Sequence, residues 1–363
     1  MNYLDKLKVT NFRGFDNIEI DRFNKINLFI GKNSSGKSSI LESIFLLIGM
    51  SNPVLPDNVN RLRGLNIRNA EEFRYLFHKL KFTNIPEFTG IFTDETERNL
   101  HLNPIYKKSA SKETQGKAIP SDELTTFDAS TAAPAVTGLE LEFSIKKRHE
   151  QKKTLKSSMI FNHPEFIPVQ NVKYKEEMHA VFIAGDSKEG NALSRFSEIV
   201  KRKKDNIILE ALRKIDSNIE SIHPLPEGLF FSYKGIEELI PSNIAGDGVR
   251  RYLNVVTTIA EKPNSIVLID EIENGLHYSA HKLLWESIIN ISQSFNIQLF
   301  ITTHSIETLK CLKELLEQEE FKNFQDYLGV YTISQTSKAG IKTYKYSFEG
   351  FKDAIESETE IRQ

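Results

Sequence analysis

The chain has 363 residues, enough to bury a large core as one domain or two, and its 39% hydrophobic and 26% charged residues are typical of a soluble globular protein. A formal net charge of −2 argues against a surface covered in nucleic-acid-binding charge, and the single cysteine excludes an internal disulfide framework. No apolar run approaches the roughly 18 residues of a membrane span. Residues 1–6 lack the apolar segment of a signal peptide, so we expect a cytoplasmic protein.

Short strands are predicted at the start of the chain. Residues 7–15 alternate apolar and polar side chains and then turn, and residues 18–20 alternate again. The unbroken apolar run at residues 26–30 predicts a third strand, and apolar residues at helical spacing from 40 to 48 predict a helix. The segment between them is therefore a strand-to-helix loop.

That loop, residues 31–38, reads Gly-Lys-Asn-Ser-Ser-Gly-Lys-Ser and matches the P-loop pattern G-x-x-x-x-G-K-[ST]. Gly31 and Gly36 permit backbone conformations in which successive N–H groups point at phosphate oxygens. Lys37 then places its charge near the β- and γ-phosphates of ATP, and Ser38 supplies a hydroxyl to Mg²⁺. The alternative is a Gly/Ser-rich turn that fits the pattern by chance. The predicted phosphate-binding residues are Gly31, Asn33, Ser34, Ser35, Gly36, Lys37, Ser38 and Ser39.

The apolar periodicity that predicts helices and strands is weaker after residue 50. A helix is predicted over residues 70–81, and strands are predicted from residue 82 to about 156, because residues 139–145 alternate. A stretch rich in Ser, Thr, Ala, Lys and Pro interrupts these strands at residues 107–138. We expect an exposed, flexible loop there.

Two clusters of basic residues lie in the middle of the chain. Residues 194–219 predict one long helix with an apolar face, and Lys201, Arg202, Lys203 and Lys204 lie on its opposite face. The other cluster contains Lys146, Lys147, Arg148, Lys152, Lys153 and Lys156. Such clusters are usually solvated surface, and the alternative is contact with DNA or RNA phosphates.

A pair of carboxylates follows a buried strand in the second half of the chain. A glycine-rich turn at residues 244–251 opens a predicted helix, and residues 265–269 then form the apolar run of a strand buried on both faces of a parallel sheet. Asp270 and Glu271 follow directly. Beside a P-loop, Asp270 can hold the Mg²⁺ shell and Glu271 can polarise an attacking water. In isolation such a pair is as often a helix N-cap.

A second polar residue ends the next predicted strand. A helix is predicted over residues 279–294 and a strand over residues 298–303, which ends at His304. We interpret His304 as a γ-phosphate sensor; the alternative is a satisfied buried histidine or a simple cap. The last predicted elements are a hairpin, formed by residues 329–334 and 341–348, and a short helix after it.

In this order the motifs resemble the ABC-type ATPase heads of the SMC, RecF and OLD (overcoming lysogeny defect) group, and more narrowly the compact bacterial ATPases classed as AAA-fifteen. The segments that carry the resemblance are residues 7–15, 31–38, 245–251, 266–277, 301–305 and 360–362. The resemblance implies an α/β fold: an ABC-type P-loop NTPase head with an N-terminal β-rich lobe, a central mainly parallel sheet flanked by helices, and a helical lobe. It also implies a single head over residues 1–363, with a variable insertion at 50–180, a helical and signature lobe at 190–260, and a Walker B and switch-histidine half at 261–363.

The same resemblance implies roles for residues around the nucleotide. Residues 31–38 correspond to Walker A, Asp270 to the Walker B aspartate and Glu271 to the catalytic glutamate. His304 corresponds to the switch histidine. Arg13 matches an N-terminal arginine that lies near the nucleotide in relatives.

A further motif points to a second subunit. Gly246 and Gly248 occupy the signature motif, which in such heads completes the ATP site of another protomer, and residues 273–277 fall on the D-loop. Relatives usually place a serine in the signature, whereas this chain reads Ala-Gly-Asp-Gly. Backbone N–H groups and the helix N-terminus would then receive the phosphate, with Arg250 or Arg251 adding charge. We expect a homodimer or higher oligomer around ATP·Mg²⁺, and slow turnover.

The expected function is an ATP-hydrolysing switch or sensor subunit that uses Mg²⁺. The chain has no room for a long coiled coil and no nuclease domain follows the head, so we expect a separate effector protein, a nuclease or toxin, in anti-phage defence. One alternative is a RecF-like DNA-binding ATPase of repair or recombination. Another is an ATP-gated scaffold with little turnover. A Q-loop glutamine is not assigned, and Gln170 is a candidate by position only.

Overall fold

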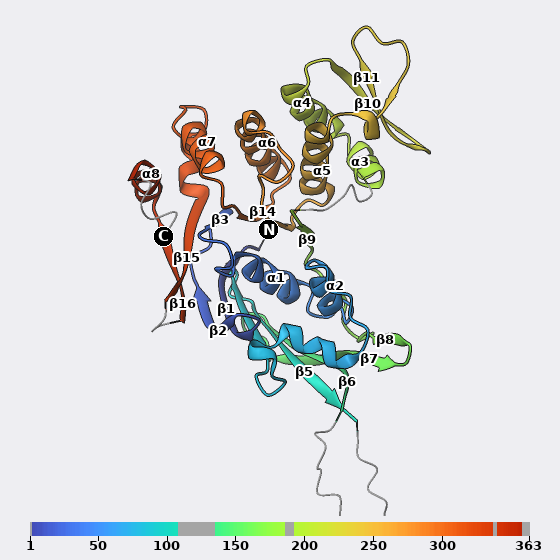
Figure 1. Cartoon of the computed structure of the whole chain (residues 1–363), viewed down its shortest axis with the longest axis vertical. Coiled ribbons are helices and arrows are strands. Elements are labelled where there is room, and N and C mark those ends of the chain that lie inside the picture. Colours follow the sequence, from blue (N-terminus) through green and yellow to red (C-terminus); the bar gives the residue numbers. More distant parts are fainter. Residues whose placement is uncertain (1, 108–134, 186–191, 337–339, 358–363) are drawn as a thin grey trace, which may run out of the picture.

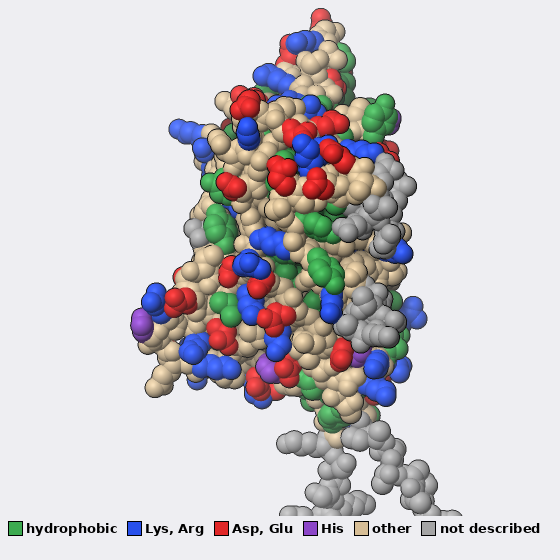
Figure 2. Space-filling view, turned by 90° about the vertical axis from the view of Figure 1, so that its left-hand side faces the viewer, with side chains coloured by type: hydrophobic (Ala, Val, Ile, Leu, Met, Phe, Trp, Pro, Cys, Tyr) green, Lys and Arg blue, Asp and Glu red, His purple; other side chains and the backbone are tan. Residues whose placement is uncertain are grey.

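The computed structural model describes residues 2–107, 135–185, 192–336 and 340–357 (Figure 1). Most of the loop expected at residues 107–138, and the motif at 360–362, lie outside these ranges. Within them, no helix has the length and apolarity needed to cross a membrane. Lys/Arg and Asp/Glu side chains are interspersed on the face that carries the C-terminal hairpin and helices, as the small net charge leads one to expect (Figure 2).

A six-stranded sheet forms the centre of the molecule, in the order β16-β15-β3-β14-β13-β9. The five strands from β15 to β9 are parallel, and β16 is antiparallel to β15. The strands are β3 (Ile26–Ile30), β9 (Ala180–Ile183), β13 (Ile266–Ile269), β14 (Gln298–Thr302), β15 (Leu328–Thr336) and β16 (Gly340–Tyr346). The structure confirms the strands predicted at 26–30, 265–269 and 298–303 and the C-terminal hairpin. The predicted and observed ends differ by no more than two residues.

Helices cover both faces of this sheet, which explains why its central strands are apolar throughout. Val267 and Ile269 face one core, and Leu268 faces the other. The first core is closed by α5 (Asp247–Glu261), α6 (His281–Ser294), α7 (Ile306–Leu316) and α8 (Phe348–Ser357). The second contains α1 (Lys37–Ile48), which lies between the central sheet and a second sheet (Figure 1). The predicted fold class, an α/β P-loop NTPase head, is confirmed.

The second sheet has seven antiparallel strands in the order β2-β1-β4-β5-β6-β7-β8. Its strands are β1 (Leu4–Phe12), β2 (Phe15–Ile20), β4 (Glu87–Phe92), β5 (Glu97–Tyr106), β6 (Val136–Lys146), β7 (Lys153–Asn162) and β8 (Glu165–Val169). Strands from the segment expected as an insertion therefore extend the N-terminal hairpin as one sheet. In the chain, α2 (Leu55–Arg61) lies between the N-terminal hairpin and β4. The segment predicted as a helix at 70–81 forms two 3₁₀ segments, Ala70–Leu76 and His78–Leu80.

The long helix predicted at residues 194–219 is wrong. The structure has α3 (Ala192–Lys201), a break, α4 (Asp205–Ile215) and then the strand β10 (Ile219–Leu225). Lys203 has a φ of +57°, a left-handed conformation that an α-helix cannot contain. The basic residues that were assigned to a helix face therefore lie mostly in a turn.

The lobe that carries α3, α4 and α5 is not purely helical. It also holds a three-stranded antiparallel sheet of β10, β11 (Gly228–Tyr233) and β12 (Ile240–Pro241), which projects beside α4 (Figure 1). Short 3₁₀ segments join several elements at Ser242–Ile244, Tyr278–Ala280 and Lys322–Tyr327. The helix α5 packs against α3 and α4, and β11 contacts the 3₁₀ segment Ser242–Ile244 directly before it.

Candidate nucleotide site

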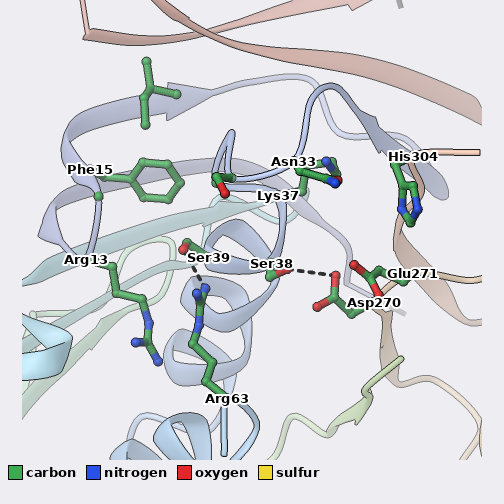
Figure 3. Close-up of a pocket in the computed structure, with 14 residues that line it drawn as sticks. Arg13, Phe15, Asn33, Lys37, Ser38, Ser39, Arg63, Asp270, Glu271 and His304 are labelled. Atoms are coloured by element: carbon green, nitrogen blue, oxygen red, sulfur yellow. Dashed lines mark hydrogen bonds between the residues drawn. The ribbon is translucent and has the colours of Figure 1, made fainter. Parts of the chain in front are cut away.

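A cleft of about 700 Å³ opens at the carboxyl ends of β3, β13 and β14, beside the N-terminus of α1. Asp270, Glu271 and His304, which follow β13 and β14, lie at one end of it, and Arg13 and Phe15 lie at the other (Figure 3). The predicted site residues that line the cleft are Arg13, Asn33, Ser34, Gly36, Lys37, Ser38, Ser39, Asp270, Glu271 and His304. Residues from both halves of the chain are therefore brought together, as parallel strands that share one sheet edge require.

The P-loop has the backbone that its glycines were expected to provide. Gly31 has a φ of +141° and Gly36 a φ of +100°, both in the range that L side chains rarely adopt. A Cβ on Gly36 would also lie 2.7 Å from the Phe15 ring. The helix α1 begins at the next residue, so its free N–H groups face the cleft and favour an anion there.

Lys37 extends back over the loop. Its Nζ donates hydrogen bonds to the carbonyl oxygens of Gly31 (2.7 Å) and Lys32 (2.8 Å), and its side chain is buried. Burial lowers the pKa of Lys37, and the nearby carboxylates of Asp270 and Glu271 oppose that shift. A buried ammonium held by carbonyl oxygens is a strong point charge for a phosphate group.

Oxygen donors converge between the two motifs. The Ser38 hydroxyl donates to Oδ1 of Asp270 at 3.1 Å, and the Thr302 hydroxyl donates to the same oxygen at 2.5 Å. The backbone N–H of Glu271 donates in turn to the Thr302 hydroxyl at 2.8 Å. A serine hydroxyl beside a carboxylate is a hard-oxygen donor set that fits Mg²⁺ with phosphate and water as further ligands. Thr302 was expected only as part of the strand at residues 298–303, and its anchoring role comes from the pairing of β13 with β14.

Two candidate catalytic side chains lie at this end of the cleft. Oε2 of Glu271 accepts a hydrogen bond from Nδ2 of Asn274 at 2.5 Å, and the residue has a φ of +49°. His304 is 43% exposed and stands next to Glu271 in Figure 3. Nδ1 of His304 lies 2.9 Å from Oε1 of Glu273, which also accepts the backbone N–H of His304. Both side chains are therefore held by residues of the turn that follows β13.

Arg13 reaches the cleft but is directed into the protein. Its Nε lies 2.6 Å from Oε2 of Glu42 on α1, and burial lowers the pKa of Arg13. The second arginine of this end, Arg63, was not predicted. Its Nε lies 2.6 Å from Oε1 of Glu42, and its Nη2 donates to the Ser39 hydroxyl at 3.0 Å. One buried carboxylate therefore holds two arginines beside the P-loop helix.

Apolar side chains at the same end were also missed. Phe15 and Ile341 line the cleft, the first from β2 and the second from β16. Phe15 lay in the segment quoted for the resemblance, but nothing in its type marked it. Ile341 is far away in the chain, and only the pairing of β16 with the central sheet brings it to the P-loop.

The signature residues do not line this cleft. Gly246 and Gly248 lie at the start of α5 and border a separate hollow with His277 and Ser279. The Asp247 carboxylate is 95% exposed and pairs with Nη1 of Arg250 at 3.2 Å. Gln170 is exposed after β8 and does not line the cleft either. A role for Gly246, Gly248 or Arg250 at an ATP site thus requires another protomer.

Similarity to known proteins extends over most of the chain. A family model described as "AAA domain, putative AbiEii toxin, Type IV TA system" matches residues 26–310. An ATP/GTP phosphatase of Helicobacter pylori is 27% identical over 354 residues, covering 88% of this chain and 90% of the relative. The DNA replication and repair protein RecF of Streptococcus pyogenes serotype M49 is 22% identical over 360 residues, covering 86% of this chain and 95% of RecF. Among solved structures, an SMC head bound to the C-terminal winged-helix domain of ScpA is 12% identical, with a TM-score of 0.49 over 96% of this chain and 98% of that one.

Proposed function

The chain belongs to the AAA domain family whose model matches residues 26–310, as an ABC-type ATPase of the SMC/RecF kind, and from that premise we propose that it binds ATP·Mg²⁺ in the P-loop cleft and hydrolyses it. One observation carries this proposal: Ser38 of the P-loop and Thr302 of β14 converge on one oxygen of Asp270, directly beside Glu271. The name of the Helicobacter pylori relative, ATP/GTP phosphatase, supports hydrolysis of a nucleoside triphosphate.

Each polar group has a task in this proposal. The loop N–H groups and Lys37 bind the β- and γ-phosphates, and Ser38 and Asp270 hold the metal ion. When bound, Mg²⁺ neutralises charge on the phosphate oxygens. Glu271 orients the attacking water and accepts its proton, and His304 contacts the γ-phosphate from the same end of the cleft.

The test is phosphate release by the wild type and by Glu271→Gln at saturating ATP and Mg²⁺. We expect the variant to be at least about 100-fold slower with ATP affinity retained, because the amide preserves shape but cannot accept a proton. Glu317→Gln is the matched control, since Glu317 pairs with Lys352 on the surface of α7 and α8. Equal rates for wild type and Glu271→Gln would favour the ATP-gated scaffold with little turnover.

ATP binding is proposed to join two protomers. The observation that supports this is the position of Gly246 and Gly248, which lie at the start of a helix outside the cleft of their own chain. A helix N-terminus of this kind is suited to receive the γ-phosphate held by a second copy. The ATP state would then control the distance between two protomers.

The biological role proposed is a switch or sensor in anti-phage defence that acts on a separate nuclease or toxin effector. The description of the family as a toxin of a toxin–antitoxin system supports a role beside a second component. The test is phage plating on the native host that carries the wild-type or the Glu271→Gln allele. Equal plating efficiency on the two alleles and on a deletion strain would exclude a defence role.

The RecF-like alternative has one observation in its favour, the similarity to RecF over 86% of the chain. The basic cluster on β6 and β7 gives it less support, because Lys156 pairs with Glu140 and Glu142, and Arg148 lies 3.3 Å from Glu95. Neighbouring carboxylates reduce the phosphate-binding potential of such a cluster. ATP-stimulated binding to duplex DNA that weakens steeply with salt would favour this alternative.

A further inference from the structure

The buried carboxylate of Glu273 lies against the imidazole ring of His304. The side chain of Glu273 is only 9% exposed, and its Oε1 lies 2.9 Å from both Nδ1 and the backbone N of His304. We propose that Glu273 is a positioning residue that fixes the orientation and the tautomer of His304, so that Nε2 faces the γ-phosphate. This inference rests on the proposed ATPase function.

The tautomer follows from the chemistry of the two groups. An ionised carboxylate only accepts hydrogen bonds, so a contact of 2.9 Å with Nδ1 requires a proton on that nitrogen. The cleft is then left with Nε2, which lies on the other side of the ring. Without the carboxylate, a neutral imidazole can carry its proton on either nitrogen and can rotate about its side-chain bonds. Glu273 thereby determines which atom of His304 meets the nucleotide.

The backbone holds the two residues in register. Glu273 follows β13 and His304 follows β14, and these strands are parallel neighbours. Beyond the strand end, the N–H of Ile272 still donates to the carbonyl oxygen of Thr302 at 3.2 Å. Asn274, the next residue in the turn, holds the Glu271 carboxylate. One turn therefore positions both the proposed base and the proposed sensor.

The negative charge of Glu273 also acts on Lys37 of the P-loop. Burial lowers the pKa of Lys37, and Glu273 is one of the three carboxylates that oppose this shift. Its Oε2 is buried without a hydrogen-bond partner in the described part of the chain. An amide at this position would still accept the hydrogen bond from the backbone N–H of His304, so Glu273→Gln removes the charge and keeps this contact.

Kinetics of four variants test the assignment: Glu273→Gln, Glu273→Ala, His304→Ala and the Glu273→Ala/His304→Ala double variant. We expect Glu273→Ala to lower kcat for ATP about tenfold with KM changed by no more than about twofold, and Glu273→Gln to retain more activity because its amide oxygen still accepts from Nδ1. If Glu273 acts through His304, the double variant is no slower than His304→Ala alone. Glu317→Gln is the control for an equal change of charge. A Glu273→Ala variant at the wild-type rate, or additive losses in the double variant, would overturn the proposal.

A spectroscopic measurement gives an independent answer. Two-bond ¹H–¹⁵N spectra of the histidine rings show which nitrogen carries the proton, and the His304 signals are assigned by their loss in His304→Ala. We expect a protonated Nδ1 in the wild type and a shift toward the Nε2–H form in Glu273→Ala. The same pattern in both proteins would contradict the inference. A wild type that shows the Nδ1–H form but releases no phosphate would contradict the proposed function and leave the role of Glu273 in place.

Discussion

At the scale of single residues, Glu42 is a residue beside the cleft that no sequence motif identifies. It lies on α1, is 1% exposed, and forms ion pairs with Arg13 and Arg63. A single carboxylate between two guanidinium groups leaves one positive charge in excess beside the P-loop. Arg13 is almost fully buried, whereas the Arg63 side chain is 40% exposed and lines the cleft. The excess charge is therefore presented to the cleft by Arg63.

Arg63→Ala tests this assignment. Because Glu42 keeps its ion pair with Arg13, we expect little loss of stability and an increase of about tenfold in the Kd for ATP, as for the loss of one charge-assisted contact. Titration with a fluorescent ATP analogue measures it. Arg61→Ala is the matched control, since Arg61 is 62% exposed two residues away and pairs with Asp57. Equal affinity for Arg63→Ala and the wild type would show that Arg63 serves only the packing of α1.

The sequence predicted those site residues that belong to local motifs. A P-loop is defined by eight consecutive residues, and Asp270 and Glu271 follow directly from the buried strand before them. Arg63 and Ile341 could not be predicted, because each reaches the cleft only through tertiary packing. Arg13 shows the opposite case. Its position was predicted, but its charge is neutralised by Glu42, a residue with no motif of its own.

At the scale of elements, the break between α3 and α4 shows how periodicity can mislead. Apolar residues such as Ile199 and Ile208 pack into the same core, so their spacing fitted one continuous helix. Periodicity records which side faces the core and does not detect a turn that leaves both helices on that side. The turn is at Lys203, whose left-handed backbone no propensity rule assigns to lysine. Strands buried on both faces were predicted well, because their apolar runs are short and are bounded by polar residues.

The start of α6 carries a pH-dependent element. His281, its first residue, is 5% exposed and Nδ1 contacts the Thr308 hydroxyl at 3.0 Å. Burial lowers its pKa from the usual 6.5; the carboxylates of Glu273 and Glu307 oppose the shift, and His277 adds to it. The folded state therefore holds this ring neutral more firmly than the unfolded chain does. As the pH falls through 6.5 the unfolded chain takes up the proton first, so acid favours unfolding.

We expect the free energy of unfolding of the wild type to decrease from about pH 7.5 to about pH 5.5, and to decrease less steeply in His281→Gln. Urea unfolding followed by circular dichroism at several pH values measures both slopes. His149→Gln, in an exposed turn after β6, should keep the wild-type slope. If His281→Gln also keeps that slope, the ring titrates alike in the folded and unfolded chains.

At the scale of the whole molecule, two sheets share one helix. The P-loop helix α1 packs on the parallel sheet with one side and on the antiparallel sheet with the other, so the nucleotide cleft lies where both sheets meet (Figure 1). The match of the family model to residues 26–310 spans parts of both sheets and the signature lobe. The resemblance to ABC-type ATPases of the SMC/RecF kind, first drawn from the order of motifs, is thereby confirmed. The division of the head into three segments stays a prediction.

The ATP-dependent dimer is a prediction at this scale, and Gly248 allows a sharp test of it. A Cβ placed on Gly248 meets nothing within 4 Å, so a side chain can begin at this position without a clash in the single chain. In a dimer that closes the signature over a second ATP, the same side chain would occupy the space of the γ-phosphate or of the facing P-loop. If the stability of the single chain is unchanged, an effect of Gly248→Leu on assembly comes from a partner protomer.

We expect Glu271→Gln with ATP·Mg²⁺ to show the mass of two chains by light scattering, and Glu271→Gln/Gly248→Leu to show the mass of one. The free energy of unfolding of the two proteins without nucleotide should agree within about 0.5 kcal/mol, because a Cβ at Gly248 meets no atom of its own chain within 4 Å. Lys322→Leu, which adds the same side chain at a 60% exposed site after α7, should leave the dimer intact. A monomeric Glu271→Gln with ATP would exclude the ATP sandwich, whereas a dimer that persists with Gly248→Leu would place the interface elsewhere. With a non-hydrolysable ATP analogue in place of ATP, the same comparison does not depend on whether Glu271 is the catalytic base.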